Sequence, residues 1–266
     1  MKKRLRLACF FTAGYTELNA LKYFFRKINA EVDYIQLCPT ASRRSKNAIR
    51  NRHNDNICRN QSGLTGDSLM DFILEFIGKD RFKEEDYDAI LIEDDKDDRF
   101  LRVSSDGYGE IDIEAWHQYE SDVKNKISEL TTIPVLFLMA SPEVKAWFYA
   151  DYSNGFGHVY RNELGTFNDT FSIKFRKYLN DNIITSHYVD EIESYGIFDG
   201  AYRKLSEEIQ DVLKSTDLAA YMGRVLDLDY SKRLEGEEML YSIDPEGVQG
   251  CCKVFFAPFF WDLKKI

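Results

Sequence analysis

The densest group of side chains that could do chemistry is the acidic run EDDKDD at residues 93–98. Five carboxylates in six residues repel one another unless water or a cation neutralises them. Mg²⁺ prefers carboxylate oxygens and usually takes one or two of them directly, with water completing its shell. Because residues two apart in a strand face the same way, we expect Asp95 and Asp97 to share an ion. A solvated charged loop is the alternative interpretation of this run.

Two further segments carry acids in comparable positions. FFTAGYTEL reads as a strand that breaks at Gly14 into a helix, with Glu17 at the start of that helix. The pocket-facing position before the glycine is Ala13, which can neither take a proton nor hold a metal. SPEVKAW follows an apolar strand and places Glu143 at a helix start, where a carboxylate complements the helix dipole or serves a metal site.

Apolar periodicity predicts the elements that must position these acids. Strands are expected at 5–11, 31–38, 88–93 and 134–140, and helices at 16–29 (with Thr16 as its N-cap), 67–77, 114–130 and 142–151. Strands that alternate with helices predict an α/β fold with a mostly parallel sheet covered on both faces. Ligands of such sheets bind beyond the carboxyl ends of the strands, so we expect all three acidic segments on one rim.

Past Gly155 the pattern changes to probable helices, at 201–213 and 217–227, followed by an aromatic tail. We therefore predict a catalytic unit at residues 1–155 and a mainly α-helical region at 156–266. The first unit contains a polar, basic insertion at 40–66 without apolar periodicity.

That insertion is the third feature with a chemical use. RRSKNAIRNRHNDNICR carries six Lys or Arg residues and one acid, Asp55, in a chain whose formal net charge is −10. A basic loop of this kind grips phosphates without reading sequence, so it predicts nucleic-acid binding. A solvated insertion that only offsets nearby acids is the alternative. The predicted phosphate contacts are Arg43, Arg44, Lys46, Arg50, Arg52 and Arg59.

Composition limits the class of protein. A hydrophobic content of 44% supports a packed core, and the five cysteines include no CxxC pair, which favours reduced thiols. No apolar run approaches the roughly 20 residues that span a bilayer, so we expect no membrane association and a cytoplasmic location. The sequence contains no Walker A, HExxH, GxSxG or GxGxxG motif, and its four histidines show no ligand spacing.

In their order and strand placement, three short motifs resemble the Toprim domain of topoisomerases, primases and OLD-type nucleases, and in particular the small stand-alone RloB-like defence proteins. They are AGYTE at 13–17, DKD at 95–97 and PEVKAW at 142–147. The resemblance covers roughly residues 5–155 and implies a Toprim-like (Rossmann-like) fold. In the acidic motif, Asp94 or Glu93 could take the place of Asp95.

The resemblance implies a Mg²⁺- or Mn²⁺-dependent nuclease that cuts DNA or RNA, including tRNA, as an effector of anti-phage defence. Such proteins often work beside an SMC/ABC-like ATPase. The family's acid–base glutamate falls at Ala13, so the chain is either an inactivated Glu→Ala form or a natural member that has lost catalysis. The implied catalytic positions are Ala13, Glu17, Asp95 and Asp97, and the implied metal ligands are Asp94, Asp95, Asp97 and Glu143.

Other readings stay open. Asp95 with Glu143-x-Lys145 matches a PD-(D/E)xK nuclease, although that motif normally lies within a strand. A catalytically empty nucleic-acid-binding or regulatory subunit fits Ala13, and a receiver-like phosphoacceptor at Asp94 is more distant. A homodimer is compatible with each of these interpretations.

The basic insertion gives a first testable prediction. Changing Arg43, Arg44, Arg50 and Arg52 to Gln should leave the melting temperature nearly unchanged, because the segment buries little apolar surface. Binding to nucleic acid should weaken, and the dependence of affinity on salt should become shallower by about 0.9 per lost phosphate contact. Fluorescence anisotropy at several salt concentrations measures both. An unaltered affinity and slope would identify the segment as a solvated insertion.

Overall fold

A four-stranded sheet forms the centre of the computed structural model. The model describes residues 4–42, 56–79, 82–103, 109–167, 169–173, 177, 192–194, 197–198, 202–205, 207 and 230–266. The strands lie in the order β2-β1-β3-β6, and each pair of neighbours is parallel. The prediction of an α/β fold with a parallel sheet is therefore confirmed. The strands are β1 (Leu5–Phe11), β2 (Val32–Cys38), β3 (Ala89–Asp95) and β6 (Val135–Ala140).

The two central strands are buried on both faces, which explains their continuous apolar sequences. All seven residues of β3 are buried, including its three terminal acids. Along β1, Leu7 and Phe11 belong to one apolar cluster, whereas Ala8 and Phe10 belong to the other. The alternation of side chains thus divides the core into two layers, one on each face of the sheet.

The first layer lies beneath α3 (Gly66–Ile77) and α4 (Ile113–Ser128). Both helices turn an apolar stripe toward the sheet, with Ile73 of α3 and Trp116 of α4 among its buried members. A capping box between Thr65 and Ser68 starts α3, and the Asp112 carboxylate caps the backbone N–H of Ala115 at the start of α4. These caps satisfy backbone donors that the first turn of a helix leaves free.

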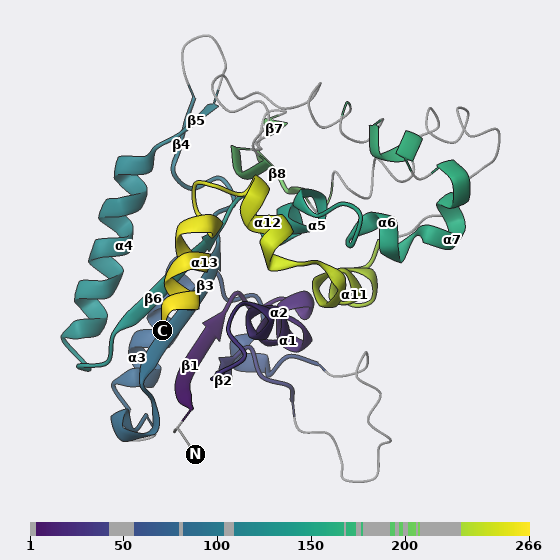
Figure 1. Cartoon of the computed structure of the whole chain (residues 1–266). Helices are drawn as coiled ribbons and strands as arrows, with labels where there is room; N and C mark the ends of the chain where they lie inside the picture. Colours follow the sequence, from purple (N-terminus) through teal and green to yellow (C-terminus); the bar gives the residue numbers. More distant parts are fainter. Residues whose placement is uncertain are drawn as a thin grey trace.

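The second layer joins the beginning and the end of the chain. Figure 1 shows the yellow C-terminal helices on the same side of the sheet as α1 and α2. Phe24 of α2 stacks on Trp147 at 5.1 Å and lies 5.8 Å from the ring of Phe256 in α13. The predicted boundary at residue 155 is therefore crossed by a shared core. The helices of this layer are α1 (Tyr15–Asn19), α2 (Leu21–Ile28), α5 (Lys145–Ala150), α11 (Glu235–Ser242), α12 (Pro245–Cys251) and α13 (Phe256–Lys265).

Shorter elements connect these layers. Two antiparallel pairs lie outside the main sheet: β4 (Leu101–Val103) with β5 (Gly109–Ile111), and β7 (Ile197–Phe198) with β8 (Tyr202–Arg203). No helix within the described ranges is long and apolar enough to cross a membrane. The remaining short helices are η2 (Arg59–Gln61), η3 (Glu84–Asp86), α6 (Phe156–Val159), α7 (Arg161–Leu164), η4 (Gly165–Phe167) and η5 (Ile192–Ser194).

Several predicted helix boundaries are wrong. The helix expected at 16–29 is divided at Ala20, and its N-cap is Gly14. Thr16 instead donates a hydrogen bond through Oγ1 to the Lys232 carbonyl, 2.9 Å away, so it ties α1 to the C-terminal region. The helix expected from residue 142 begins at Lys145. The strand β8 begins the segment expected to be helical at 201–213, and the helix expected at 217–227 lies outside the described residues.

Candidate functional site

Four carboxylates and one ammonium group meet at the carboxyl ends of the central strands. Lys145 lies at the centre, with Nζ 3.1 Å from Glu17 Oε1 and 3.5 Å from Glu143 Oε2. We call this group, which also includes Glu93 and Asp95, the carboxylate cluster. Its side chains come from α1, the end of β3 and the start of α5. The acidic segments therefore share one rim, as the strand-end rule predicts.

Strand alternation selects which acids of β3 enter the cluster. Glu93 and Asp95 lie on the same face of the strand as Leu91, on the side of α2 and α5. Glu93 accepts a hydrogen bond from the backbone N–H of Thr12 through Oε2 at 3.2 Å. Asp95 accepts one from the backbone N–H of Val144 through Oδ1 at 3.1 Å, which fixes the start of α5 against the end of β3.

A close backbone approach positions Glu17. A Cβ atom added to Gly14 would lie 2.0 Å from Oε2 of Glu17, so the glutamate packs directly against the glycine backbone. A side chain at position 14 would force the Glu17 carboxylate away from Lys145. This is a physical reason for glycine at the turn that follows β1.

Burial dominates the electrostatics of the cluster. The residues are between 0% and 7% exposed. Burial, followed by the charges of neighbouring acids, raises the pKa of Glu93 well above its ordinary value. Burial also raises the pKa of Asp95, although Lys145 opposes the shift. Burial alone would lower the pKa of Lys145, but the charges of Glu17, Asp95 and Glu143 outweigh it and raise that pKa, so the ammonium stays protonated at neutral pH.

The cluster is incompletely satisfied. Glu17 Oε2 and Glu93 Oε1 are buried and accept no hydrogen bond from the described residues. The Lys145 ammonium lies among four acids, and a buried carboxylate without a partner is costly unless it is protonated or meets a cation. In the described part of the chain, no group of three or more His, Cys, Asp or Glu residues is arranged to hold a metal ion as it stands. Lys145, which bridges two of the carboxylates, supplies the positive charge instead.

Asp94 lies on the opposite face of β3 and is not part of the cluster. Its Oδ1 accepts hydrogen bonds from Thr65 Oγ1 at 3.1 Å and from the backbone N–H of Gly66 at 3.0 Å, at the start of α3. Its Oδ2 pairs with the Arg99 guanidinium at 2.5 Å. These contacts give Asp94 a structural role, and they leave it poorly placed as either the expected metal ligand or a phosphoacceptor.

Asp97 lies beside the cluster because of the turn after β3, and not because it shares a strand face with Asp95. Strand β3 ends at Asp95, and Asp97 lies in a turn with a left-handed backbone (φ 49°), so the two acids are not related by strand alternation. The backbone N–H of Asp97 donates to the Pro142 carbonyl at 2.7 Å, and its Oδ2 lies 3.2 Å from Lys204 Nζ. Its charge still contributes to the raised pKa of Asp95.

Ala13 faces the other layer of the core. It is 6% exposed and belongs to the apolar cluster with Cys38 and Leu69, beneath α3 and α4. Its neighbours Thr12 and Gly14 both contact members of the carboxylate cluster. The side chain of a glutamate at position 13 would therefore leave the backbone among apolar residues. The interpretation of Ala13 as an emptied acid–base position stays a prediction.

The basic insertion lies mainly outside the described residues, which exclude Arg43, Arg44, Lys46, Arg50 and Arg52. Its two ends are held together by backbone hydrogen bonds, from Ser42 to Asn56 and from Cys58 to Thr40. Arg59 begins η2 and is exposed. No described contact tests the predicted binding of nucleic acid.

Two residues near the cluster could not be found by sequence reasoning. Tyr230 is buried, and its pKa is raised by burial despite the opposing charge of Lys145. Lys204 pairs with Asp97 at the edge of the cluster. Both come from the second half of the chain, where no acidic run or motif marks a site.

Searches against known protein families, curated proteins and solved structures found no match to this chain. The geometry of the carboxylate cluster therefore carries the functional proposal by itself.

The raised pKa of Glu93 predicts how stability depends on pH. The folded protein holds this proton more tightly than the unfolded chain does, so stability is lost as pH rises above the ordinary pKa of 4.5. Glu93→Gln removes this loss. In EDTA, it should raise the melting temperature at pH 7 by about 2 °C or more, with no gain at pH 4.

The exposed substitution Glu31→Gln is the matched control and should change the melting temperature at neither pH. A lower melting temperature of Glu93→Gln at pH 7 would mean that the charged form of Glu93 stabilises the fold.

Proposed function

We propose that this chain is a divalent-cation-dependent nuclease and that the carboxylate cluster is its active site. One observation carries the proposal: three separate segments bring four buried carboxylates to the rim of a parallel sheet, with the Lys145 ammonium among them and Lys204 nearby. A cluster with this excess of negative charge is expensive to fold, and a cation that enters it relieves the cost. The resemblance to Toprim nucleases supports the same reaction class.

Carboxylate oxygens are the donors that Mg²⁺ and Mn²⁺ prefer, and an ion would take the place that the Lys145 ammonium occupies between Glu17 and Glu143. Glu17 Oε2 and Glu93 Oε1 are buried acceptors without a hydrogen-bond partner among the described residues. Glu17, Asp95 and Glu143 would hold the ion, with Glu93 beside it. When bound, such an ion polarises the scissile phosphate and lowers the pKa of its water.

The remaining roles follow from the protonation states of the chain's own groups. Lys145 keeps its proton, so it supplies positive charge to a phosphate and does not act as a general base. Burial raises the pKa of Glu93, so this carboxyl holds a proton more readily than an ordinary glutamate and is suited to a general acid–base role. Glu93 of β3 would then perform the acid–base role that the resemblance assigns to position 13.

Access requires residues around the cluster to move, because its side chains are buried. Tyr230 and Lys204, from the second half of the chain, lie close to it. A nuclease with a closed site must open before it binds nucleic acid. The SMC/ABC-like ATPase implied by the resemblance is a candidate for the partner that opens it, in a cytoplasmic defence system.

The proposal predicts cleavage that depends on both the metal and the cluster. Nicking of plasmid DNA and cleavage of total tRNA should appear with Mg²⁺ or Mn²⁺ and disappear with EDTA. Asp95→Asn and Glu143→Gln should each lower the rate by about 10²-fold or more, because each removes a charged oxygen donor. Gel assays at matched protein concentration measure the rate.

Asp98→Asn is the control, since Asp98 belongs to the same acidic run but is exposed. It should cleave as the unchanged chain does. Equal activity of all variants would place the reaction elsewhere. Absence of cleavage, together with absence of Mn²⁺ binding by calorimetry, would remove the enzyme proposal.

A second candidate is a catalytically empty nucleic-acid-binding subunit. It is favoured by the position of the Lys145 ammonium, which already bridges Glu17 and Glu143. In this case the lysine neutralises a former metal site, and the basic insertion performs the binding.

If the unchanged chain does not cleave, Ala13→Glu tests whether position 13, and not Glu93, is the acid–base site. If position 13 is an emptied acid–base site, the substitution should raise the cleavage rate by about 10²–10⁴-fold. Ala13→Gln, of the same size but without an ionisable group, should not. A folded Ala13→Glu protein that stays inert while binding nucleic acid would favour the empty subunit.

A further inference from the structure

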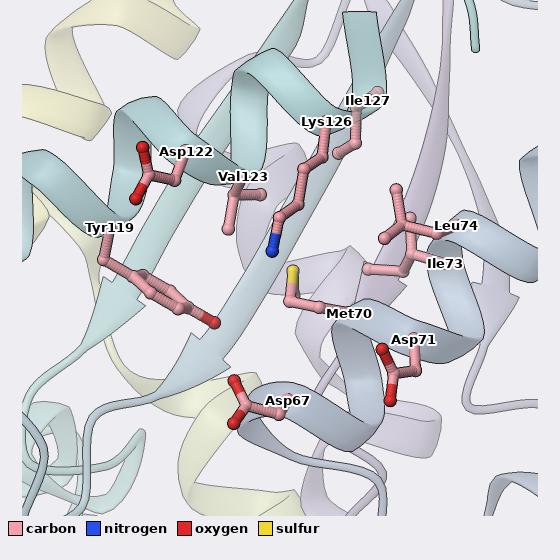
Figure 2. Close-up of a pocket in the computed structure, with 10 residues that line it drawn as sticks. All are labelled: Asp67, Met70, Asp71, Ile73, Leu74, Tyr119, Asp122, Val123, Lys126 and Ile127. Atoms are coloured by element: carbon pink, nitrogen blue, oxygen red, sulfur yellow. The ribbon is translucent and has the colours of Figure 1, made fainter. Parts of the chain in front are cut away.

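A groove between α3 and α4, remote from the carboxylate cluster, has no role in the proposed reaction. Its volume is about 460 Å³, and its floor consists of buried side chains from both helices, Met70, Ile73, Val123 and Ile127. Figure 2 shows these apolar side chains between the two helices, with polar side chains around them. The groove lies between two helices of the layer that covers the first face of the sheet.

The rim of the groove is acidic. Asp67 and Asp71 form no ion pair with any described residue, and the Asp122 carboxylate accepts a hydrogen bond from the neutral Gln118 amide at 2.8 Å. Three carboxylates against the single ammonium of Lys126 leave a net charge of −2. Unpaired acids above an apolar floor complement a ligand that has an apolar stripe bordered by cations.

The shape of the groove follows from helix periodicity. Tyr119, Val123 and Ile127 line the α4 side of the groove at intervals of four residues, and Met70 and Leu74 line its α3 side. Eight residues of α4 span about 12 Å, or roughly two helical turns. A groove between the ridges of two packed helices is the usual seat of a third helix.

We propose that the groove between α3 and α4 docks a basic amphipathic helix of a partner protein. Apolar residues of that helix, spaced at i, i+3, i+4 and i+7, contact the floor, and its lysines or arginines pair with Asp67, Asp71 and Asp122. Figure 2 shows the Lys126 side chain extending over the floor toward Met70, so this side chain moves aside when the helix binds. The docking surface is independent of the proposed nuclease activity.

The test uses a fluorescent 14-residue synthetic helix with leucine along one stripe and lysine elsewhere, and a twin with glutamate in place of lysine. Fluorescence anisotropy with the full chain should detect the lysine helix alone. The triple variant Asp67→Asn, Asp71→Asn, Asp122→Asn should bind it about tenfold more weakly. The charge-matched control Glu31→Gln, Glu85→Gln, Asp262→Asn changes three acids elsewhere and should bind within about twofold of the unchanged chain.

Two substitutions at Lys126 separate shape from charge. Lys126→Gln removes the single positive charge of the rim and should strengthen binding of the lysine helix. Lys126→Trp removes the same charge but covers the floor, so it should weaken binding. Lys126 is exposed, and both variants should keep the melting temperature of the unchanged chain.

Three results would overturn the proposal. Equal losses of affinity in the rim triple and the control triple would show that the net charge of the protein attracts the helix. Binding by Lys126→Trp as tight as by Lys126→Gln would place the helix outside the groove. A dimer in light scattering that the rim triple dissociates would assign the groove to a second copy of this chain.

Discussion

This part of the fold depends on the ion pairs that the Lys145 ammonium forms with Glu17 and Glu143. The ammonium lies among buried carboxylates from segments far apart in the chain, and its partner Glu17 is 128 residues away in sequence. Without a cation at this point, the carboxylates of α1, β3 and the start of α5 would repel one another. Removing one partner of a buried ion pair typically costs about 3–5 kcal/mol, because the other charge is left unpaired. Electrostatic contacts, as well as apolar ones, therefore hold α5 against the sheet.

The acidic side chains at the end of β3 point to both faces of the sheet and have different roles on each. Glu93 and Asp95 point to the layer of α2 and α5, where charge accumulates. Asp94, between them, points to the other layer and holds the first turn of α3 together with Arg99. Its hydrogen bonds to the start of the helix use the positive end of the helix dipole. One stretch of sequence thus supplies both the charged site and the anchor of a helix on the opposite face.

Most of the architecture could be predicted from the sequence, because apolar runs such as LRLACFF leave few alternatives for a central strand. The shared rim of the acids followed from the topology of parallel sheets alone. The acids at the end of β3 were harder to assign from the sequence. Whether Asp95 or Asp94 enters the cluster depends on which residues of the acidic run face the same side of the strand. Lys145 was marked only by the short Glu143-x-Lys145 motif, and its place between Glu17 and Glu143 follows from tertiary packing. Tyr230 and Lys204 reach the cluster only through tertiary packing, which local periodicity does not record.

The shared core of the second layer has a consequence for synthesis of the protein on the ribosome. Phe24 of α2 meets its aromatic partner Phe256 only after the long intervening stretch of chain has been made. At about 5–20 residues per second, the roughly 230 residues from Phe24 to Phe256 take about 12–46 s to translate. During this interval the nascent sheet exposes one apolar face without its C-terminal cover. The growing chain is therefore a natural client for chaperones that shield such surfaces until the last helices emerge.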